Sequence, residues 1–131
     1  MKKSVVIAGA GHASGQVAVS LRQGGYDGRI VVVGEEPYLP YQRPPLSKKY
    51  LAGELTAERL YVKPPTFYEG AGVEFELETR IEEIDRTARC LRTDKGTEIA
   101  YDQLVLSLGS RARRLPVDGV TLERVHYLRT I

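Results

Sequence analysis

A glycine-rich turn, and a pair of acids one strand later, are the residues of this sequence best suited to bind a dinucleotide. The turn is Gly9-Ala10-Gly11-His12-Ala13-Ser14-Gly15, and Glu35 and Glu36 close the next apolar run. Glycines leave backbone N–H groups at a helix start open to a pyrophosphate, and a carboxylate about twenty residues further on accepts hydrogen bonds from a ribose diol. An ordinary glycine-rich turn explains the glycines but not the acid, so the pattern predicts a Rossmann-type site.

A β-α-β unit over residues 4–33 is expected to hold this turn in place. Residues 5–8 and 30–33 are apolar throughout, which is typical of parallel strands that are covered on both faces. Between them, an amphipathic pattern predicts a helix from about residue 13 to residue 23, and the Gly24-Gly25 pair ends it.

The segment that follows is rich in proline and tyrosine. Residues 37–49 are too proline-rich for a central strand and too apolar for a flexible linker, so we expect an ordered loop packed against another part of the chain. Pro64-Pro65 can open a short helix that runs through Tyr68, because proline is tolerated in a first helical turn.

The rest of the chain reads as strands. Residues 73–78 alternate strictly between apolar and acidic, which predicts a strand with one exposed face. A short antiparallel meander is predicted over residues 80–85, 89–93 and 97–100, with a hairpin at residues 94–96. The apolar run 104–108 is expected to rejoin the parallel sheet. The predicted fold class is therefore α/β, a Rossmann-like parallel sheet with an inserted antiparallel β-meander.

Composition narrows the classes of function. The 131 residues fit one domain, and 19 basic against 17 acidic residues give no electrostatic case for nucleic acid or an anionic membrane. No segment has the roughly 20 apolar residues of a membrane helix, and Met1-Lys2-Lys3 leads into a run too short for a signal peptide. Cys90, read as a half-buried strand residue, is the only cysteine. A Cys-rich metal site and an internal disulfide are excluded, and we expect a cytoplasmic protein.

The chain stops inside an apolar-flecked stretch. Residues 125–131 carry no polar tail and no closing helix. We expect such an ending where a domain is incomplete, either because a larger chain was cut or because the remainder lies on another polypeptide. A frayed natural terminus is the alternative.

Five stretches of the sequence resemble the N-terminal flavin-binding portion of FAD-dependent ferredoxin reductases, which include putidaredoxin and rubredoxin reductases. The stretches are residues 9–13, 33–37, 43–48, 104–111 and 127–130. The most specific is Arg43-Pro44-Pro45-Leu46-Ser47-Lys48, because no generic Rossmann fold requires that hexapeptide. The resemblance places the chain in the pyridine nucleotide-disulfide oxidoreductase superfamily and implies that residues 1–131 are the N-terminal segment of an FAD-binding domain.

The same resemblance implies a set of cofactor-binding residues. They are Gly9, Gly11, His12, Ala13, Ser14, Glu35, Arg43, Lys48, Ile81, Gly109 and Arg129. The glycine turn would line the FAD pyrophosphate, Glu35 would hold the adenosine ribose, and Ile81 would offer its backbone to the adenine. Lys48, expected to be catalytic, would lie near the reactive face of the isoalloxazine, and Arg129 would approach the flavin or its ribityl chain. A cation there favours the anionic reduced ring.

Departures from the family and missing motifs refine the expected reaction. Ser107-Leu108-Gly109 stands where the family usually has Ala-Thr-Gly, and Ser14 replaces a glycine or alanine. No cysteine precedes Cys90, which argues against dithiol exchange, and no second glycine-rich turn supplies a nicotinamide domain. The expected activity is hydride transfer from NAD(P)H to FAD, then one-electron transfer to an iron–sulfur protein of the ferredoxin or rubredoxin type. This segment alone is expected to be inactive and to bind FAD weakly or not at all.

Two other interpretations stay open. The chain could be a non-catalytic module that binds NAD or an adenine nucleotide through the same turn, or a folding fragment with no ligand. His12 is expected on the surface at a helix start, and His126 lacks a catalytic partner in sequence. Arg111, Arg113 and Arg114 are typical of a solvated edge, which faces either an acidic protein or a cofactor phosphate.

Overall fold

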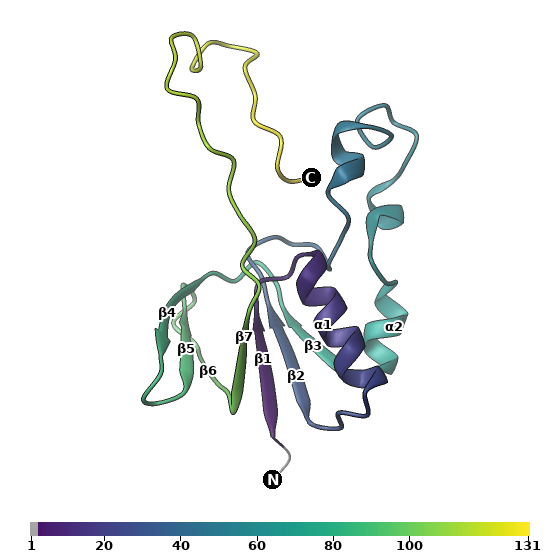
Figure 1. The fold of residues 1–131 in the computed structure, drawn as a ribbon, viewed down its shortest axis with the longest axis vertical. Helices are drawn as coiled ribbons and strands as arrows, with labels where there is room; N and C mark the ends of the chain where they lie inside the picture. The colour runs from purple at the N-terminus through teal and green to yellow at the C-terminus, as the bar shows by residue number, and fades with distance from the viewer. Residues whose placement is uncertain (1–2) are drawn as a thin grey trace.

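The computed structural model describes residues 3–131; Met1 and Lys2, on which the signal-peptide argument partly rests, lie outside the described residues. Within the described residues, the fold consists of two sheets, two α-helices and two short 3₁₀ helices, η1 and η2 (Figure 1). In chain order the elements are β1 (Ser4–Ala8), α1 (His12–Gln23), β2 (Arg29–Val33), η1 (Pro44–Ser47), η2 (Ala57–Leu60), α2 (Pro65–Gly70), β3 (Val73–Glu76), β4 (Ile81–Asp85), β5 (Cys90–Thr93), β6 (Glu98–Ala100) and β7 (Gln103–Leu106). The predicted α/β class is confirmed.

The larger sheet has the strand order β3-β2-β1-β7, and all three pairings are parallel. Val6 of β1 lies opposite Val31 of β2 on one side and Leu104 of β7 on the other. The last apolar run therefore rejoins the sheet as predicted, although the strand ends at Leu106, two residues early. Because the strands are parallel, their carboxyl ends share one edge.

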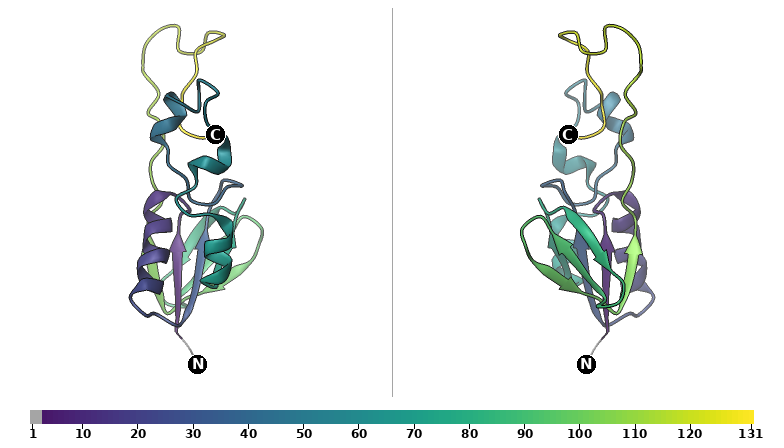
Figure 2. Two further views of the ribbon diagram at one scale, coloured as in Figure 1. Left: turned by 90° about the vertical axis from the view of Figure 1, so that its right-hand side faces the viewer. Right: turned by 90° about the vertical axis from the view of Figure 1, so that its left-hand side faces the viewer.

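Both faces of this sheet are covered, which confirms the interpretation of the apolar strands. Helices α1 and α2 pack on one face and the meander β4-β5-β6 covers the other (Figure 2). The helix side buries Val5, Ile7, Ala18, Ile30, Val32, Tyr68 and Val73, and the meander side buries Val6, Val31, Val33 and Leu91. Burial of these side chains is the main force that holds the three layers together.

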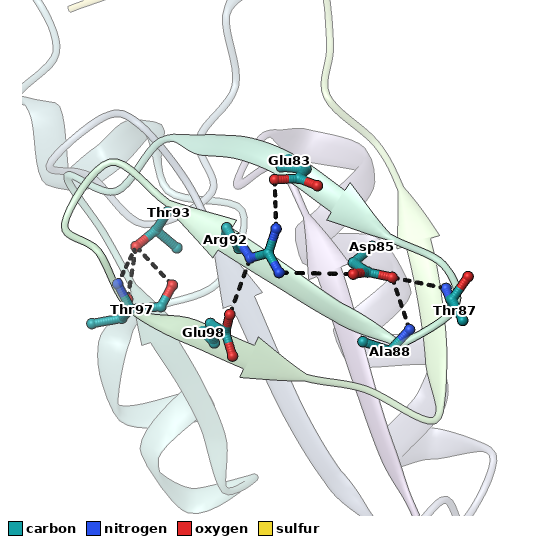
Figure 3. Close-up of polar contacts among 8 residues, drawn as sticks. All are labelled: Glu83, Asp85, Thr87, Ala88, Arg92, Thr93, Thr97 and Glu98. Atoms are coloured by element: carbon teal, nitrogen blue, oxygen red, sulfur yellow. Dashed lines mark hydrogen bonds and ion pairs between the residues drawn. The ribbon is translucent and has the colours of Figure 1, made fainter.

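The meander is antiparallel, as predicted, and its turn at residues 94–96 places Gly96 at a φ of 72°. Arg92, on the central strand β5, reaches Glu83 at 2.8 Å and Glu98 at 3.0 Å, which lie on the two flanking strands (Figure 3). These two hydrogen bonds raise the pKa of Arg92. Cys90 is 7% exposed and so more buried than expected, because β5 has a neighbour on each side.

The proline- and tyrosine-rich segment forms a lobe of residues 37–63 beyond the carboxyl ends of the strands (Figure 1). Tyr41, Leu46 and Leu60 are buried together in it, and Tyr41 forms an antiparallel bridge with Tyr61. The expected ordered loop is confirmed, and it packs chiefly against its own returning half.

Residues 107–131, here called the C-terminal arm, leave β7, extend away from the sheet and fold back toward the lobe (Figures 1 and 2). The arm contains neither helix nor strand. Within it, the Leu115 N–H donates to the Tyr127 hydroxyl at 2.9 Å, and Arg114 lies over the Tyr127 ring. Leu108, Leu115, Leu122 and Leu128 are each more than half exposed. In the described part of the chain, no helix has the length and apolar character needed to cross a membrane.

Candidate functional site

A cavity of about 840 Å³ opens at the carboxyl ends of β1, β2 and β7. The glycine turn, the segment between β3 and β4, and both ends of the C-terminal arm form its walls. Nine of the predicted site residues line it: Gly9, Gly11, His12, Ala13, Glu35, Arg43, Ile81, Gly109 and Arg129. Open parallel sheets bind ligands at this edge.

The glycine turn is shaped by close contact with the start of the C-terminal arm. Gly9 has a φ of +107°, and a Cβ there would lie 2.1 Å from the Ser107 carbonyl oxygen, so no other residue fits. At Gly11, by contrast, a Cβ would meet nothing within 4 Å. Helix α1 follows with no side-chain cap and no acidic residue in its first turn. The first N–H groups of the helix are therefore left for an anion beside the cavity.

Glu35 presents a carboxylate without a close partner. Its side chain is 59% exposed, and it is 3.8 Å from Arg80 Nε and 3.9 Å from Arg111 Nη2. Within residues 3–131 it accepts no hydrogen bond, so its oxygens remain available to a ligand. Arg111 comes from the arginine cluster of the sequence, whereas no sequence signal pointed to Arg80.

Glu36, Tyr41 and Arg43 form a hydrogen-bonded network at the edge of the cavity. Arg43 Nη2 donates to Glu36 at 2.6 Å, and Arg43 Nη1 donates to the Tyr41 hydroxyl at 2.7 Å. The Tyr41 hydroxyl in turn donates to Glu36 at 2.5 Å. Arg43 Nη1 also donates to the Arg129 carbonyl oxygen at 2.8 Å. The Nη groups of Arg43 are therefore engaged by the protein itself, a connection that the spacing of the sequence did not reveal.

Arg129 is a cation of the cavity wall with unused hydrogen-bonding capacity. Its Nε donates to the Ser110 carbonyl oxygen at 2.9 Å. Its two Nη groups have no protein partner among residues 3–131. Two free N–H-bearing groups on a guanidinium suit a phosphate or another anion that accepts two hydrogen bonds.

Two predicted residues lie outside this cavity. The Lys48 Nζ is exposed and donates to the Pro44 carbonyl oxygen at 3.2 Å and to the Ser47 hydroxyl at 3.4 Å. Its catalytic role stays a prediction. Ser14 is fully buried behind the turn, where its hydroxyl is 2.7 Å from that of Ser107. In the described part of the chain, no three His, Cys, Asp or Glu residues are grouped to hold a metal ion.

The two serines that depart from the family pattern thus contact each other. We expect Ser14→Ala to lower the free energy of unfolding by about 1 kcal/mol, because it leaves the Ser107 hydroxyl without its main partner. Ser107→Ala should cost a similar amount. The double variant should cost little more than either single one, as urea unfolding would measure. Fully additive losses would show that the two hydroxyls do not interact.

Tyr41 should make the stability of the fold depend on pH. Burial and the hydrogen bond to Glu36 raise the pKa of Tyr41 to about 12, against smaller opposing effects of Arg43 and the Ile131 backbone. In the unfolded chain a tyrosine titrates near pH 10. The unfolded state therefore loses this proton first, and stability should fall by up to about 2.7 kcal/mol as the pH rises from about 10 to 12. Tyr41→Phe should remove that component from denaturation curves, whereas Tyr50→Phe, which breaks no hydrogen bond, should retain it.

Comparison with known proteins identifies the family of this chain. The family model of the pyridine nucleotide-disulphide oxidoreductases matches residues 3–131. The chain belongs to this family. A ferredoxin–NAD(P)+ reductase of Sphingomonas is 44% identical over 126 residues, which are 96% of this chain and 30% of the reductase.

Solved structures agree with this assignment. The ferredoxin reductase of the CYP199A2 system from Rhodopseudomonas palustris is 48% identical with a TM-score of 0.90, over 98% of this chain and 31% of that one. The reductase in a covalent putidaredoxin reductase–putidaredoxin complex is 40% identical with a TM-score of 0.84, over 89% of this chain and 28% of that one. The chain spans about 30% of the length of its relatives.

Proposed function

We propose that residues 1–131 are the N-terminal segment of the FAD-binding domain of an NAD(P)H-dependent ferredoxin or rubredoxin reductase. One observation carries the proposal: one cavity at the sheet edge combines the open glycine turn, a Glu35 carboxylate that accepts no hydrogen bond within residues 3–131, and an Arg129 with free Nη groups. When bound, FAD would supply the chemistry of the reaction, namely hydride acceptance from NAD(P)H and single-electron delivery to an iron–sulfur protein.

The residues present fit this cofactor. The open side of Gly11 and the uncapped start of α1 suit the pyrophosphate, because they offer N–H groups and no obstructing side chain. Glu35 suits the adenosine ribose, whose hydroxyls it can accept, and the backbone near Ile81 suits the adenine. Arg129 lies on the wall formed by the arm and would supply positive charge there.

The remaining parts of the reaction belong to a longer protein in this proposal. The nicotinamide site lies on chain outside these residues, and the electron acceptor is an iron–sulfur protein of the ferredoxin or rubredoxin type. We place the protein in the cytoplasm, with which its single, buried cysteine is compatible.

One observation favours a second candidate, a non-catalytic module for NAD or an adenine nucleotide. Every residue assigned to the adenosine side lines the cavity, whereas Lys48, assigned to the flavin side, does not. Such a module would use the glycine turn and Glu35 alone, and it would leave the Arg43–Lys48 hexapeptide without a purpose.

Ligand binding separates the two candidates. We expect FAD to raise the melting temperature of the protein expressed from the full reading frame that contains these residues, with a weak or absent shift for the 131-residue chain. Glu35→Gln should weaken FAD binding about tenfold, because it removes a charged acceptor for the ribose. Glu54→Gln, on the exposed lobe, is the matched control and should have no effect.

The other outcomes are equally readable. Stabilisation of both proteins by NAD or ADP, with none by FAD, would favour the nucleotide-binding module. The absence of a shift with any of the three would contradict both candidates and leave a fragment without a ligand.

A further inference from the structure

We propose that Glu36, Tyr41 and Arg43 act as a positioning network that holds Arg129 against the cavity wall. None of the three was expected to act in this way, and Tyr41 was not among the predicted site residues. The claim about position stands on geometry alone, whereas its consequence for FAD rests on the proposed function.

The network joins three parts of the fold that are far apart in sequence. Glu36 follows β2, Tyr41 and Arg43 belong to the lobe, and Arg129 lies near the end of the arm. Tyr41 is 2% exposed, and the Arg43 guanidinium lies 4.8 Å above the centre of its ring. Packing and the three hydrogen bonds among Glu36, Tyr41 and Arg43 therefore hold the Arg43 guanidinium in position independently of the arm.

The arm depends on this contact because it has few others. Within residues 3–131, the hydrogen bonds that reach residues 111–131 from residues 3–106 come from this network: Arg43 donates to the Arg129 carbonyl, and the Tyr41 hydroxyl interacts with the Ile131 backbone. Ile131 adds apolar packing against the buried cluster of the lobe. Further hydrogen bonds of the returning arm lie within the arm itself. The position of Arg129 is therefore set mainly from the lobe.

The charges of Arg43 and Arg129 also indicate that the two residues have different roles. Glu36 lies 2.6 Å from Arg43 and neutralises it, so Arg43 contributes little net charge to the cavity. Arg129 has no acidic partner within residues 3–131 and retains its charge for a ligand. Arg43 thus acts through Arg129, which makes it a positioning residue rather than an independent anion site.

Hydrogen exchange tests the positional claim without any ligand. Tyr41→Phe removes one hydroxyl and keeps the ring, so we expect backbone amides of residues 128–131 to exchange at least about fivefold faster. Arg43→Lys, which keeps the charge but loses the two-pronged contact, should do the same. Tyr50→Phe, whose hydroxyl bonds to nothing among residues 3–131, is the matched control. Unchanged exchange in the Tyr41 and Arg43 variants, with the fold intact by circular dichroism, would overturn the proposal.

A double-variant cycle tests the consequence for FAD in the full-length protein. We expect Tyr41→Phe to weaken FAD binding about tenfold when Arg129 is present and to have little further effect in an Arg129→Gln background. A purely structural role for Tyr41 would give the same loss in both backgrounds, which would overturn the proposal. If the wild-type protein binds no FAD but exchange still responds to Tyr41→Phe, the positioning network stands and the FAD assignment fails.

Discussion

Gly9→Ala is expected to destabilise the fold by about 3 kcal/mol, one of the largest effects of any single substitution in this chain. The φ of +107° is strained for any side chain, and the new Cβ would lie 2.1 Å from the Ser107 carbonyl oxygen. Because that neighbour is backbone, relief requires β1 and the start of the arm to separate. Urea unfolding followed by circular dichroism measures the loss.

Gly11→Ala is the matched control, since a Cβ at Gly11 meets nothing within 4 Å and its φ is not positive. It should leave the free energy of unfolding within about 0.5 kcal/mol of wild type. A bulkier Gly11→Val should instead reduce dinucleotide binding by filling the open side of the turn. Equal destabilisation by Gly9→Ala and Gly11→Ala would contradict the assigned geometry of the turn.

Arg22→Ala is expected to cost about 3 kcal/mol, although Arg22 is only a basic residue near a helix end in the sequence. Its guanidinium donates to four backbone carbonyl oxygens, those of Tyr26, Gly28, Ala71 and Gly72, at 2.6 to 3.0 Å. These carbonyls follow α1 and α2, and removal of the side chain leaves them unpaired in a partly buried place. A fall in melting temperature of about 10 °C is the expected readout.

Arg92→Ala provides the comparison, because Arg92 also bonds to several residues but lies on the surface. Its side chain is 45% exposed, and its partners Glu83 and Glu98 are exposed as well. Water and salt screen such pairs, so the loss should stay below about 1 kcal/mol. A larger loss of stability for Arg92→Ala than for Arg22→Ala would contradict this prediction. It would show that the ion pairs on the meander contribute more than the hydrogen bonds from Arg22 to the carbonyl groups that follow α1 and α2.

Most of the fold could be predicted from local patterns in the sequence. The apolar residues 5–8 of β1 and 30–33 of β2 could be recognised as buried parallel strands, and the alternation around Phe75 predicted a strand with one exposed face. The sequence did not indicate η1 or η2, because in a proline-rich segment the helical turns depend on how Leu46 and Leu60 pack together. The end of β7 was placed late because Ser107 and Leu108 are drawn toward the glycine turn.

The candidate site likewise contains features that local sequence motifs predict and features that depend on contacts between distant residues. The glycine turn and Glu35 were found because their chemistry is local, a short motif followed by an acid at a typical distance. The bond between Arg43 and Arg129 joins residues 86 positions apart, and the Ser14–Ser107 contact joins residues 93 apart. Pairs at such separations leave no periodic mark in a single sequence. The role of Lys48 rests on the family resemblance and stays a prediction.

The free edge of β7 has a practical consequence. Among residues 3–131 this strand pairs only with β1, and Leu106 at its end is 60% exposed. Unpaired strand edges flanked by apolar side chains are templates for pairing between copies of a chain. We therefore expect concentrated preparations of the isolated polypeptide to self-associate through this edge.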